Sequence, residues 1–288
     1  MNKEAVVIAV ANDKGGVGKT TTACNLAAGL AYKLGYEGLD ESVLLVDLDK
    51  QGNCADVFGM RESVFDWELR PDGPCLSRVL RGRVALEDAL LEVRPNLYLL
   101  PASEEVEFAV QELTLADYAA AARGRVSRGH VPLEQILEDR LGPARSVFRF
   151  IILDCPPHLG ALERAVYSFA DHVITPTPLH YMSVLMTGEN TLRLERLRNE
   201  GTRARLLCVV PTMTSPFGDD DRPRHVGERQ MYESLLDTYS ARVVAAPVMK
   251  SVKVEESPGL GMPIFDYAPD SEPARAYGRL VEKVFHAR

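Results

Sequence analysis

The sequence predicts an α/β protein with an open, doubly wound and mostly parallel sheet that carries helices on both faces. Short apolar runs rich in β-branched residues alternate with longer amphipathic stretches, which is the pattern of parallel strands joined by helices. A glycine-rich loop follows the first apolar run and opens the first amphipathic stretch, as in folds that bind phosphate at a sheet edge. No polar linker separates two complete sets of strands, so we expect a single domain over residues 1–288.

Each element follows from this alternation. The apolar runs predict buried strands at Ala5–Ala11, Val43–Asp47, Leu97–Pro101, Phe148–Asp154, His172–Thr175, Leu206–Val210 and Ala241–Val244. The amphipathic stretches predict helices at Thr20–Leu34, Glu104–Ala121, Pro132–Leu141, Leu162–Phe169, Val184–Asn199, Val226–Thr238 and Glu272–Phe285. Residues Met60–Pro74 show no clear period and are expected to be a loop with short helical turns, and Ala119–His130 is expected to be an exposed linker.

Composition limits the classes of function. The chain has 33 Lys and Arg against 41 Asp and Glu, a formal charge of −8, which excludes a uniformly basic protein that coats nucleic acid but leaves room for a local basic patch. It has no signal-peptide pattern and no apolar run of the roughly 18 residues that span a bilayer, so we expect a cytoplasmic protein without a membrane partner. The five cysteines are scattered without a C-x-x-C pair, and we expect buried, reduced thiols.

The loop at residues 11–21 predicts a phosphate-binding site. Its sequence, ANDKGGVGKTT, lies between an apolar strand and an amphipathic helix. Glycines allow backbone N–H groups to surround phosphate oxygens, Lys19 supplies a cation and the Thr20 hydroxyl can bind Mg²⁺. The usual motif has a glycine where this chain has Asp13, and a second lysine, Lys14, stands inside the loop. Two lysines in a short glycine loop would repel each other, which favours an anionic ligand over a purely structural turn.

Acidic residues end two of the predicted strands. Asp47 and Asp49 close the segment VLLVDLDKQGN, and alternation along a strand places both on the side where the phosphate loop lies. Asp154 ends the apolar strand of FIILDCPPHLG. The alternative for the first pair is two solvated acids at a strand end. His158 is either a polar loop residue or a group that touches nucleotide or a partner subunit.

These motifs resemble those of the ParA/MinD superfamily, in particular the ParA/Soj-type partition ATPases. KGGVGKTT is similar to the deviant Walker A motif, DLDKQGN to the Walker A′ segment DLDPQGN, and DCPPHLG to DCPPSLG, with Lys50 and His158 replacing the family's proline and serine. The C-terminal segment from Val248 to Tyr277 resembles the ParA tail. Only about residues 60–95 and 119–146 depart from the pattern, so we expect a family-divergent insertion of helices and loops at about 60–146.

The resemblance implies a P-loop NTPase of the deviant Walker A class and gives roles to particular residues. Catalytic roles fall to Lys14, Lys19 and Asp49, with Lys14 reaching across a nucleotide-sandwiched dimer and Asp49 orienting the attacking water. Mg²⁺ would be held by Thr20, Asp47 and Asp154, the carboxylates through water. The implied ATP contacts are Lys14, Gly15, Gly16, Val17, Gly18, Lys19, Thr20 and Thr21 at the phosphates, and Pro211, Thr212, Met213, Pro247, Val248 and Met249 beside the adenine.

ParA relatives also bind DNA without sequence preference, through basic side chains on the C-terminal side of the dimer. The matching positions are Arg222, Arg224, Lys250 and Lys253. The alternative is ordinary solvated surface charge, because residues 219–221 are all Asp. The last helix places Leu280, Val281 and other apolar residues on one face, which we interpret as core packing rather than a membrane anchor.

The implied function is a slow, Mg²⁺-dependent ATPase that dimerises with ATP, binds double-stranded DNA and segregates plasmid or chromosomal DNA with a ParB-like adaptor that stimulates hydrolysis. It would associate with the nucleoid when ATP-bound. Two alternatives stay open: a ParA-like ATPase that positions a protein cargo, and a non-hydrolysing ATP-binding regulator. An iron–sulfur reductase of the nitrogenase iron-protein type is disfavoured, because the cysteines lack the spacing for a cluster bridging two subunits.

Overall fold

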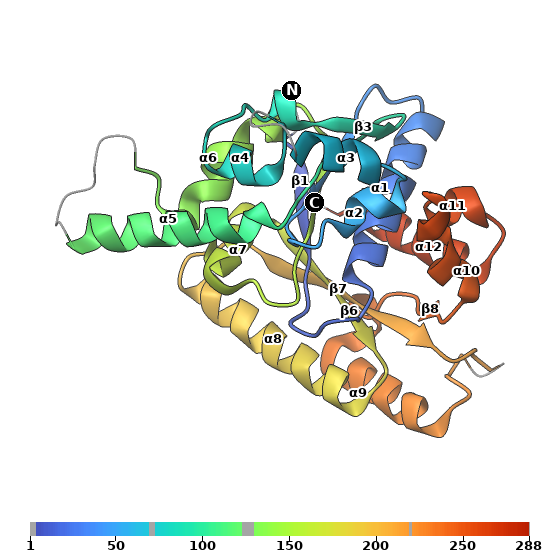
Figure 1. Ribbon diagram of the computed structural model, residues 1–288. Helices are drawn as coiled ribbons and strands as arrows, with labels where there is room; N and C mark the ends of the chain where they lie inside the picture. Colours follow the sequence, from blue (N-terminus) through green and yellow to red (C-terminus); the bar gives the residue numbers. More distant parts are fainter. Residues whose placement is uncertain (1–3, 69–72, 123–129, 219–220, 288) are drawn as a thin grey trace.

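A computed structural model describes residues 4–68, 73–122, 130–218 and 221–287. All its strands lie in one sheet, in the order β3-β4-β2-β5-β1-β6-β7-β8 (Figure 1). The strands are β1 (Val6–Val10), β2 (Val43–Asp47), β3 (Leu91–Arg94), β4 (Leu97–Leu100), β5 (Phe150–Asp154), β6 (His172–Pro178), β7 (Arg205–Thr214) and β8 (Val248–Met249). Every pairing is parallel except that between β3 and β4. The predicted fold class is therefore confirmed.

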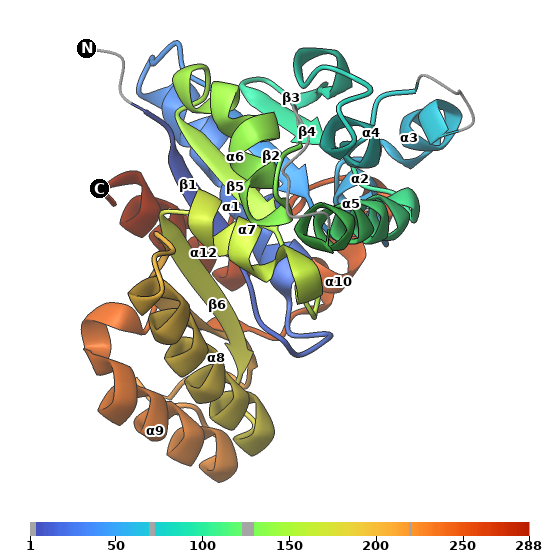
Figure 2. The same ribbon diagram turned by 90° about the vertical axis from the view of Figure 1, so that its left-hand side faces the viewer.

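Helices cover both faces because the central strands bury both of theirs. In β1, Ile8 and Val10 belong to one apolar core, whereas Val7 and Ala9 belong to the core on the opposite face. The first core is covered by α1 (Lys19–Tyr36), α2 (Asn53–Val57), α3 (Arg61–Glu68), α10 (Val252–Glu256), α11 (Ile264–Tyr267) and α12 (Glu272–Phe285). The second face carries α4 (Leu76–Leu80), α5 (Glu105–Ala122), α6 (Ile136–Leu141), α7 (Glu163–Phe169), α8 (Tyr181–Asn199) and α9 (Val226–Val243), with α8 and α9 side by side (Figure 2).

The last strand lies elsewhere than the sequence predicts. Residues 241–243 end helix α9 instead of forming a strand, and Val244 makes a single bridge to Val209. The edge strand follows at β8, where Val248 pairs with Thr212. Ser240, at φ 60° and ψ 157°, interrupts the helix just before residues 241–243. Only Val244, directly after the helix, is buried against the sheet, and the composition of so short a segment does not distinguish a helix end from a strand.

The region at about 60–146 is more regular than its composition predicts. Residues expected to be loop contain α3, and residues 119–122 of the expected linker belong to α5; residues 69–72 and 123–129 lie outside the described part. Strand β3 is an element that the sequence pattern does not predict. It pairs with β4 through a two-residue turn, Pro95-Asn96, in which Asn96 adopts φ 62°. Helix α5 extends from the body of the molecule (Figure 1).

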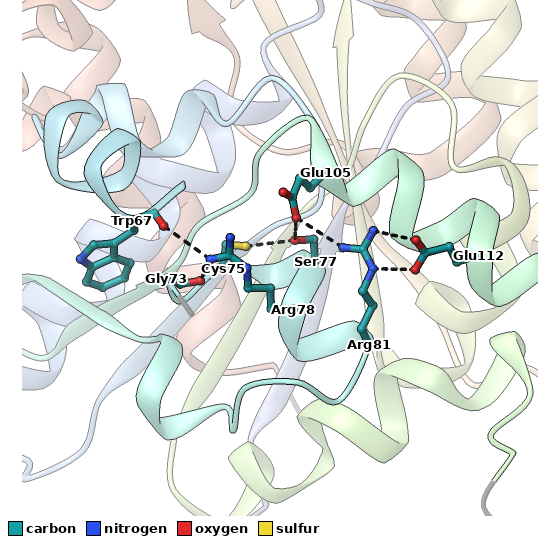
Figure 3. Close-up of polar contacts among 8 residues, drawn as sticks. All are labelled: Trp67, Gly73, Cys75, Ser77, Arg78, Arg81, Glu105 and Glu112. Atoms are coloured by element: carbon teal, nitrogen blue, oxygen red, sulfur yellow. Dashed lines mark hydrogen bonds and ion pairs between the residues drawn. The ribbon is translucent and has the colours of Figure 1, made fainter. Parts of the chain in front are cut away.

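Polar contacts fasten α5 to α4 (Figure 3). Arg81, which directly follows α4, forms ion pairs with Glu105 at 3.4 Å and Glu112 at 2.7 Å, and its guanidinium lowers the pKa of Glu112. Ser77 donates a hydrogen bond to Glu105 at 3.3 Å. The buried Arg78 donates to the carbonyl oxygens of Trp67 and Gly73 and holds the chain on either side of residues 69–72. These contacts join α4, α5 and the chain on both sides of residues 69–72, while β4 of the same region pairs with β2 in the sheet.

Two expectations from composition can be compared with the structure. All five cysteines are free and buried, as predicted. Within the described residues, no helix combines the length and apolarity needed to cross a bilayer.

Candidate nucleotide and metal site

The loop between β1 and α1 encloses the ammonium group of Lys19. Gly16 and Gly18 adopt φ 69° and 88°, a left-handed conformation that favours glycine, and Gly18 is the N-cap of α1. Lys19, the first residue of α1, is only 7% exposed, and its Nζ donates to the Lys14 carbonyl oxygen at 2.9 Å. Burial lowers its pKa, and nearby Asp154 opposes that shift. The loop thus holds a cation at a helix N-terminus, a geometry suited to phosphate.

The second loop lysine contacts helix α8. Lys14 Nζ donates to Ser183 Oγ at 2.9 Å, and its backbone N–H donates to Asn12 Oδ1 at 3.0 Å. The preceding residue, Asp13, forms an ion pair with Arg193 of α8 at 2.6 Å. Sequence reasoning missed both α8 partners because they are distant in the chain. These contacts fix the start of the loop against α8.

Two buried carboxylates meet beside the loop. Asp47 and Asp154 end neighbouring strands and are paired in register, with exposures of 1% and 0%. Asp47 accepts backbone hydrogen bonds from Asp49 at 3.0 Å and Cys54 at 3.1 Å. Burial raises the pKa of Asp154 to about 7, and burial with the adjacent Asp154 charge raises that of Asp47. Within the described residues, Asp154 Oδ1 has no hydrogen-bond partner.

This pair fits a divalent cation. Two adjacent buried carboxylates are costly without a compensating positive charge, and an unpartnered carboxylate oxygen is the ligand type that Mg²⁺ prefers. Thr20 follows Lys19 on α1, and its hydroxyl interacts with Asp154 and partly offsets the rise in that pKa. Thr20, Asp47 and Asp154, predicted from separate motifs, are therefore brought to one place.

The segment after β2 faces α5. The side chain of Asp49 accepts a hydrogen bond from the backbone N–H of Gln51 at 3.1 Å. Lys50 forms an ion pair with Glu107 of α5 at 2.6 Å. Asp49, Lys50 and Glu107 line a cavity of about 400 Å³, together with the exposed His158 and the rest of residues 156–162. His158 thus lies near Asp49. The partner of Lys50 could not be read from the sequence, because Glu107 lies in the divergent insertion.

A second cavity, of about 420 Å³, opens beside the phosphate loop. It is lined by Gly18 and Thr21 of the loop and α1, by Thr212 and Met213 of β7, and by Val248 and Met249 of β8. Pro211 and Pro247 directly precede Thr212 and Val248 in the sequence, but they are not among the residues that line this cavity. Thr212 Oγ1 donates to the Val17 carbonyl oxygen at 2.9 Å and joins β7 to the loop. The strand ends predicted to flank adenine therefore adjoin the phosphate loop.

The predicted DNA-contacting residues lie near the ends of β7 and β8. Lys250, Lys253 and Arg224 are exposed, and the Lys250 amide donates to the Thr214 carbonyl oxygen at 2.9 Å. Arg222 stacks over the Tyr232 ring at 5.8 Å, with Glu233 3.8 Å from its Nε. Lys250 also lines the cavity beside the phosphate loop. A substitution of Lys250 could therefore change this cavity as well as the surface charge.

Comparison with known proteins identifies relatives along the whole chain. Residues 5–200 match the family described as "AAA domain". The chromosome-partitioning ATPase Soj of Thermus thermophilus is 32% identical, with 96% of this chain and 94% of that protein covered. The chromosome partitioning protein ParA of Caulobacter vibrioides is 29% identical over 96% of this chain and 93% of its own length.

Solved structures share the fold and include nucleotide complexes. The ATP complex of a single-residue variant of Cyanothece McdA superposes with a TM-score of 0.77 at 21% identity and covers 99% of this chain and 98% of that one. Cobyrinic acid a,c-diamide synthase from Mycobacterium smegmatis, with a bound ATP analogue and magnesium, gives 0.74 at 26% identity over 98% and 94%. This fold therefore binds nucleotide and magnesium in proteins similar to this chain.

Proposed function

The chain belongs to the ParA/MinD superfamily of P-loop ATPases, and we propose that it is an ATP-operated switch that segregates plasmid or chromosomal DNA. One observation carries the nucleotide assignment: the glycine loop holds the buried Lys19 next to the paired carboxylates Asp47 and Asp154. A bound ATP would lie with its phosphates along residues 14–21 and its base in the cavity lined by Thr212, Met213, Val248 and Met249.

In this proposal catalysis is positioning and charge stabilisation. Lys19 and the loop amides hold the β- and γ-phosphates, while Asp49, next to the site, orients the attacking water. Mg²⁺, held by Thr20, Asp47 and Asp154, would neutralise charge on the phosphate oxygens. The residues at the phosphates are Gly15, Gly16, Val17, Gly18, Thr20 and Thr21, with Pro211 and Pro247 shaping the strand ends beside the base.

Switching would depend on a second copy of the chain. Lys14 would leave Ser183 of α8 and reach the phosphates of a partner subunit, which makes dimerisation ATP-dependent. The ATP-bound dimer would bind double-stranded DNA without sequence preference through Arg222, Arg224, Lys250 and Lys253, and so associate with the nucleoid in the cytoplasm. A ParB-like adaptor would stimulate hydrolysis and release. The similarity to Soj and ParA supports this assignment over cargo positioning.

Replacing each loop lysine tests the nucleotide assignment. Lys19→Ala should abolish ATP binding, measured by calorimetry, because it removes the enclosed cation at the phosphates. Lys14→Ala is the matched control: it removes a lysine from the same loop but should keep ATP binding within one subunit. Affinity of Lys19→Ala within about threefold of the unaltered chain, less than about 1 kcal/mol, would refute the phosphate assignment.

A further inference from the structure

Lys50 lies in the turn that carries Asp49, and the proposed ATPase mechanism gives it no role. The turn is closed by a hydrogen bond from the Gly52 N–H to the Asp49 carbonyl oxygen at 3.0 Å. The Asp49 carboxylate accepts a hydrogen bond from the Gln51 N–H at 3.1 Å, so the turn itself orients this side chain. A displacement of the turn therefore also displaces the Asp49 carboxylate.

Two contacts join this turn to the chain around the start of α5. Lys50 Nζ donates to Glu107 Oε2 at 2.6 Å, and this hydrogen bond raises the pKa of Lys50. A Cβ on Gly52 would lie 2.9 Å from the Ala102 carbonyl oxygen, so the backbone of the turn also approaches the segment that leads into α5. Within the described residues, Glu107 forms no ion pair besides that with Lys50.

Glu107 is presented by a well-anchored part of α5. It lies in the first turn of the helix, between Val106 and Ala109, which are 3% and 0% exposed. Glu105 in the same turn forms an ion pair with Arg81 at 3.4 Å (Figure 3). The start of α5 is thus held by buried side chains and by a polar contact, and Glu107 can act as a fixed attachment point for Lys50.

The place of this ion pair is more informative than its contribution to folding. The Lys50 and Glu107 side chains are 48% and 51% exposed, and ion pairs as exposed as this one stabilise a fold only slightly. Both residues, however, line the cavity of about 400 Å³ that Asp49 also lines. We therefore expect the pair to affect the position of Asp49 more than the stability of the chain.

We propose that Glu107 is a positioning residue for ATP hydrolysis: by holding Lys50, it fixes the turn in which Asp49 orients the attacking water. This inference rests on the proposed function, because it requires that role of Asp49. Neither Lys50 nor Glu107 belongs to the phosphate loop or lines the cavity assigned to the base. Loss of the ion pair should therefore lower kcat and leave the KM for ATP unchanged.

A double-mutant cycle on the ATPase rate tests this role. Glu107→Gln and Lys50→Met should each lower kcat by about three- to fivefold, which corresponds to about 0.7–1 kcal/mol. Neither variant should change the KM for ATP or the melting temperature. The double variant should lose no more than either single variant, because each substitution alone already breaks the same pair.

Glu104→Gln is the matched control. It removes an exposed acid three residues earlier, and Glu104 influences Lys50 only through its charge, without a hydrogen bond. This control should keep the kcat of the unaltered chain. A loss in Glu104→Gln equal to that in Glu107→Gln would show that general charge, and not the ion pair, is responsible, and would overturn the proposal.

Three further results would also overturn the positioning role. They are an unchanged kcat in Glu107→Gln, a loss confined to Lys50→Met, which would mean that Lys50 acts without Glu107, and losses that multiply in the double variant. Asp49→Ala separates this failure from that of the proposed function. If Asp49→Ala keeps hydrolysing ATP, the role of Asp49 fails and the inference fails with it. If Asp49→Ala is inactive while Glu107→Gln keeps its full rate, only the positioning role fails.

Discussion

At the scale of single residues, the buried carboxylate of Asp154 is costly to ionise when no cation is bound. Burial raises its pKa to about 7, so between its usual value of 3.8 and 7 the folded chain retains a proton that the unfolded chain releases. The free energy of unfolding therefore falls as pH rises through this window, and the ionised carboxylate destabilises the fold above it. A residue suited to holding a cation thus reduces stability when no cation is bound.

Asp154→Asn should accordingly stabilise the metal-free chain. The uncharged amide avoids the desolvation penalty, so we expect a gain of about 1 kcal/mol or more near pH 8, where the native carboxylate is ionised. Near about pH 5 the gain should shrink, because the folded chain is then protonated at Asp154. Urea unfolding with a chelator present, at both pH values, measures the difference. An equal effect at the two pH values would contradict the ionisation account.

Sequence patterns predicted the site residues that lie in contiguous motifs, and missed those that reach it from elsewhere. The phosphate loop and the strand-end residues Asp47 and Asp154 follow from local order along the chain. Ser183 and Glu107 become neighbours of Lys14 and Lys50 only through packing of α8 and α5. Cys54 is the buried thiol that the sequence predicts, but its contact with Asp154 depends on how α2 docks against β5.

At the scale of elements, periodicity identified the buried strands and most helices, and it failed where the fold leaves the regular alternation. Strand β3 is short, exposed on one side and followed by a Pro95-Asn96 turn, and apolar periodicity does not register such turn residues. In residues 241–244, Val244 is buried beside Val209 of β7 whereas Ala241 and Arg242 are exposed, and the interruption of the helix at Ser240 is a backbone feature that periodicity does not register. Apolar composition reports burial rather than element type.

The contact between α1 and α12 gives a prediction at this scale. A Cβ on Gly29 of α1 would lie 2.5 Å from Val281 Cγ2 and 2.8 Å from Phe265 Cε2. Although alanine is the better helix former, Gly29→Ala should destabilise the chain by about 1–3 kcal/mol through overpacking. Thermal and urea unfolding measure the change.

Gly188→Ala in α8 is the matched control for this overpacking, because a Cβ there meets no atom within 4 Å. It should be neutral or stabilising by up to about 1 kcal/mol, through helix propensity alone. If both variants changed stability by the same amount and in the same direction, the close packing of α1 on α12 would not be the cause.

At the scale of the whole molecule, net charge and surface charge lead to different expectations. A formal charge of −8 opposes strong, charge-driven DNA coating, whereas Arg224 and Lys253 are exposed in the segments that follow the neighbouring strands β7 and β8. Binding through a few such side chains per subunit would be weak, salt-sensitive and strengthened by dimerisation. That combination suits a protein that must release DNA after hydrolysis.

Charge reversal tests this surface. Arg224→Glu with Lys253→Glu should weaken ATP-dependent DNA retention at low salt and leave ATP affinity unchanged; Lys250 is left intact because it lines the cavity beside the phosphate loop. The control reverses Arg196 and Arg198, an exposed pair at the far end of α8, with the same change in net charge. Retention of DNA on a filter by the bound protein measures the DNA binding of both variants. Equal losses in the two variants would indicate that only total charge matters.

The ATP-operated switch is tested most directly by the mass of the Asp49→Ala chain in solution, measured by light scattering with and without ATP and Mg²⁺. Asp49→Ala should stop hydrolysis and so preserve the ATP-bound state. We predict a monomer without nucleotide and a dimer with ATP, and a return to monomer, with ATP still bound, when Lys14→Ala is added. An Asp49→Ala chain that binds ATP yet keeps one mass in both conditions would contradict the switch.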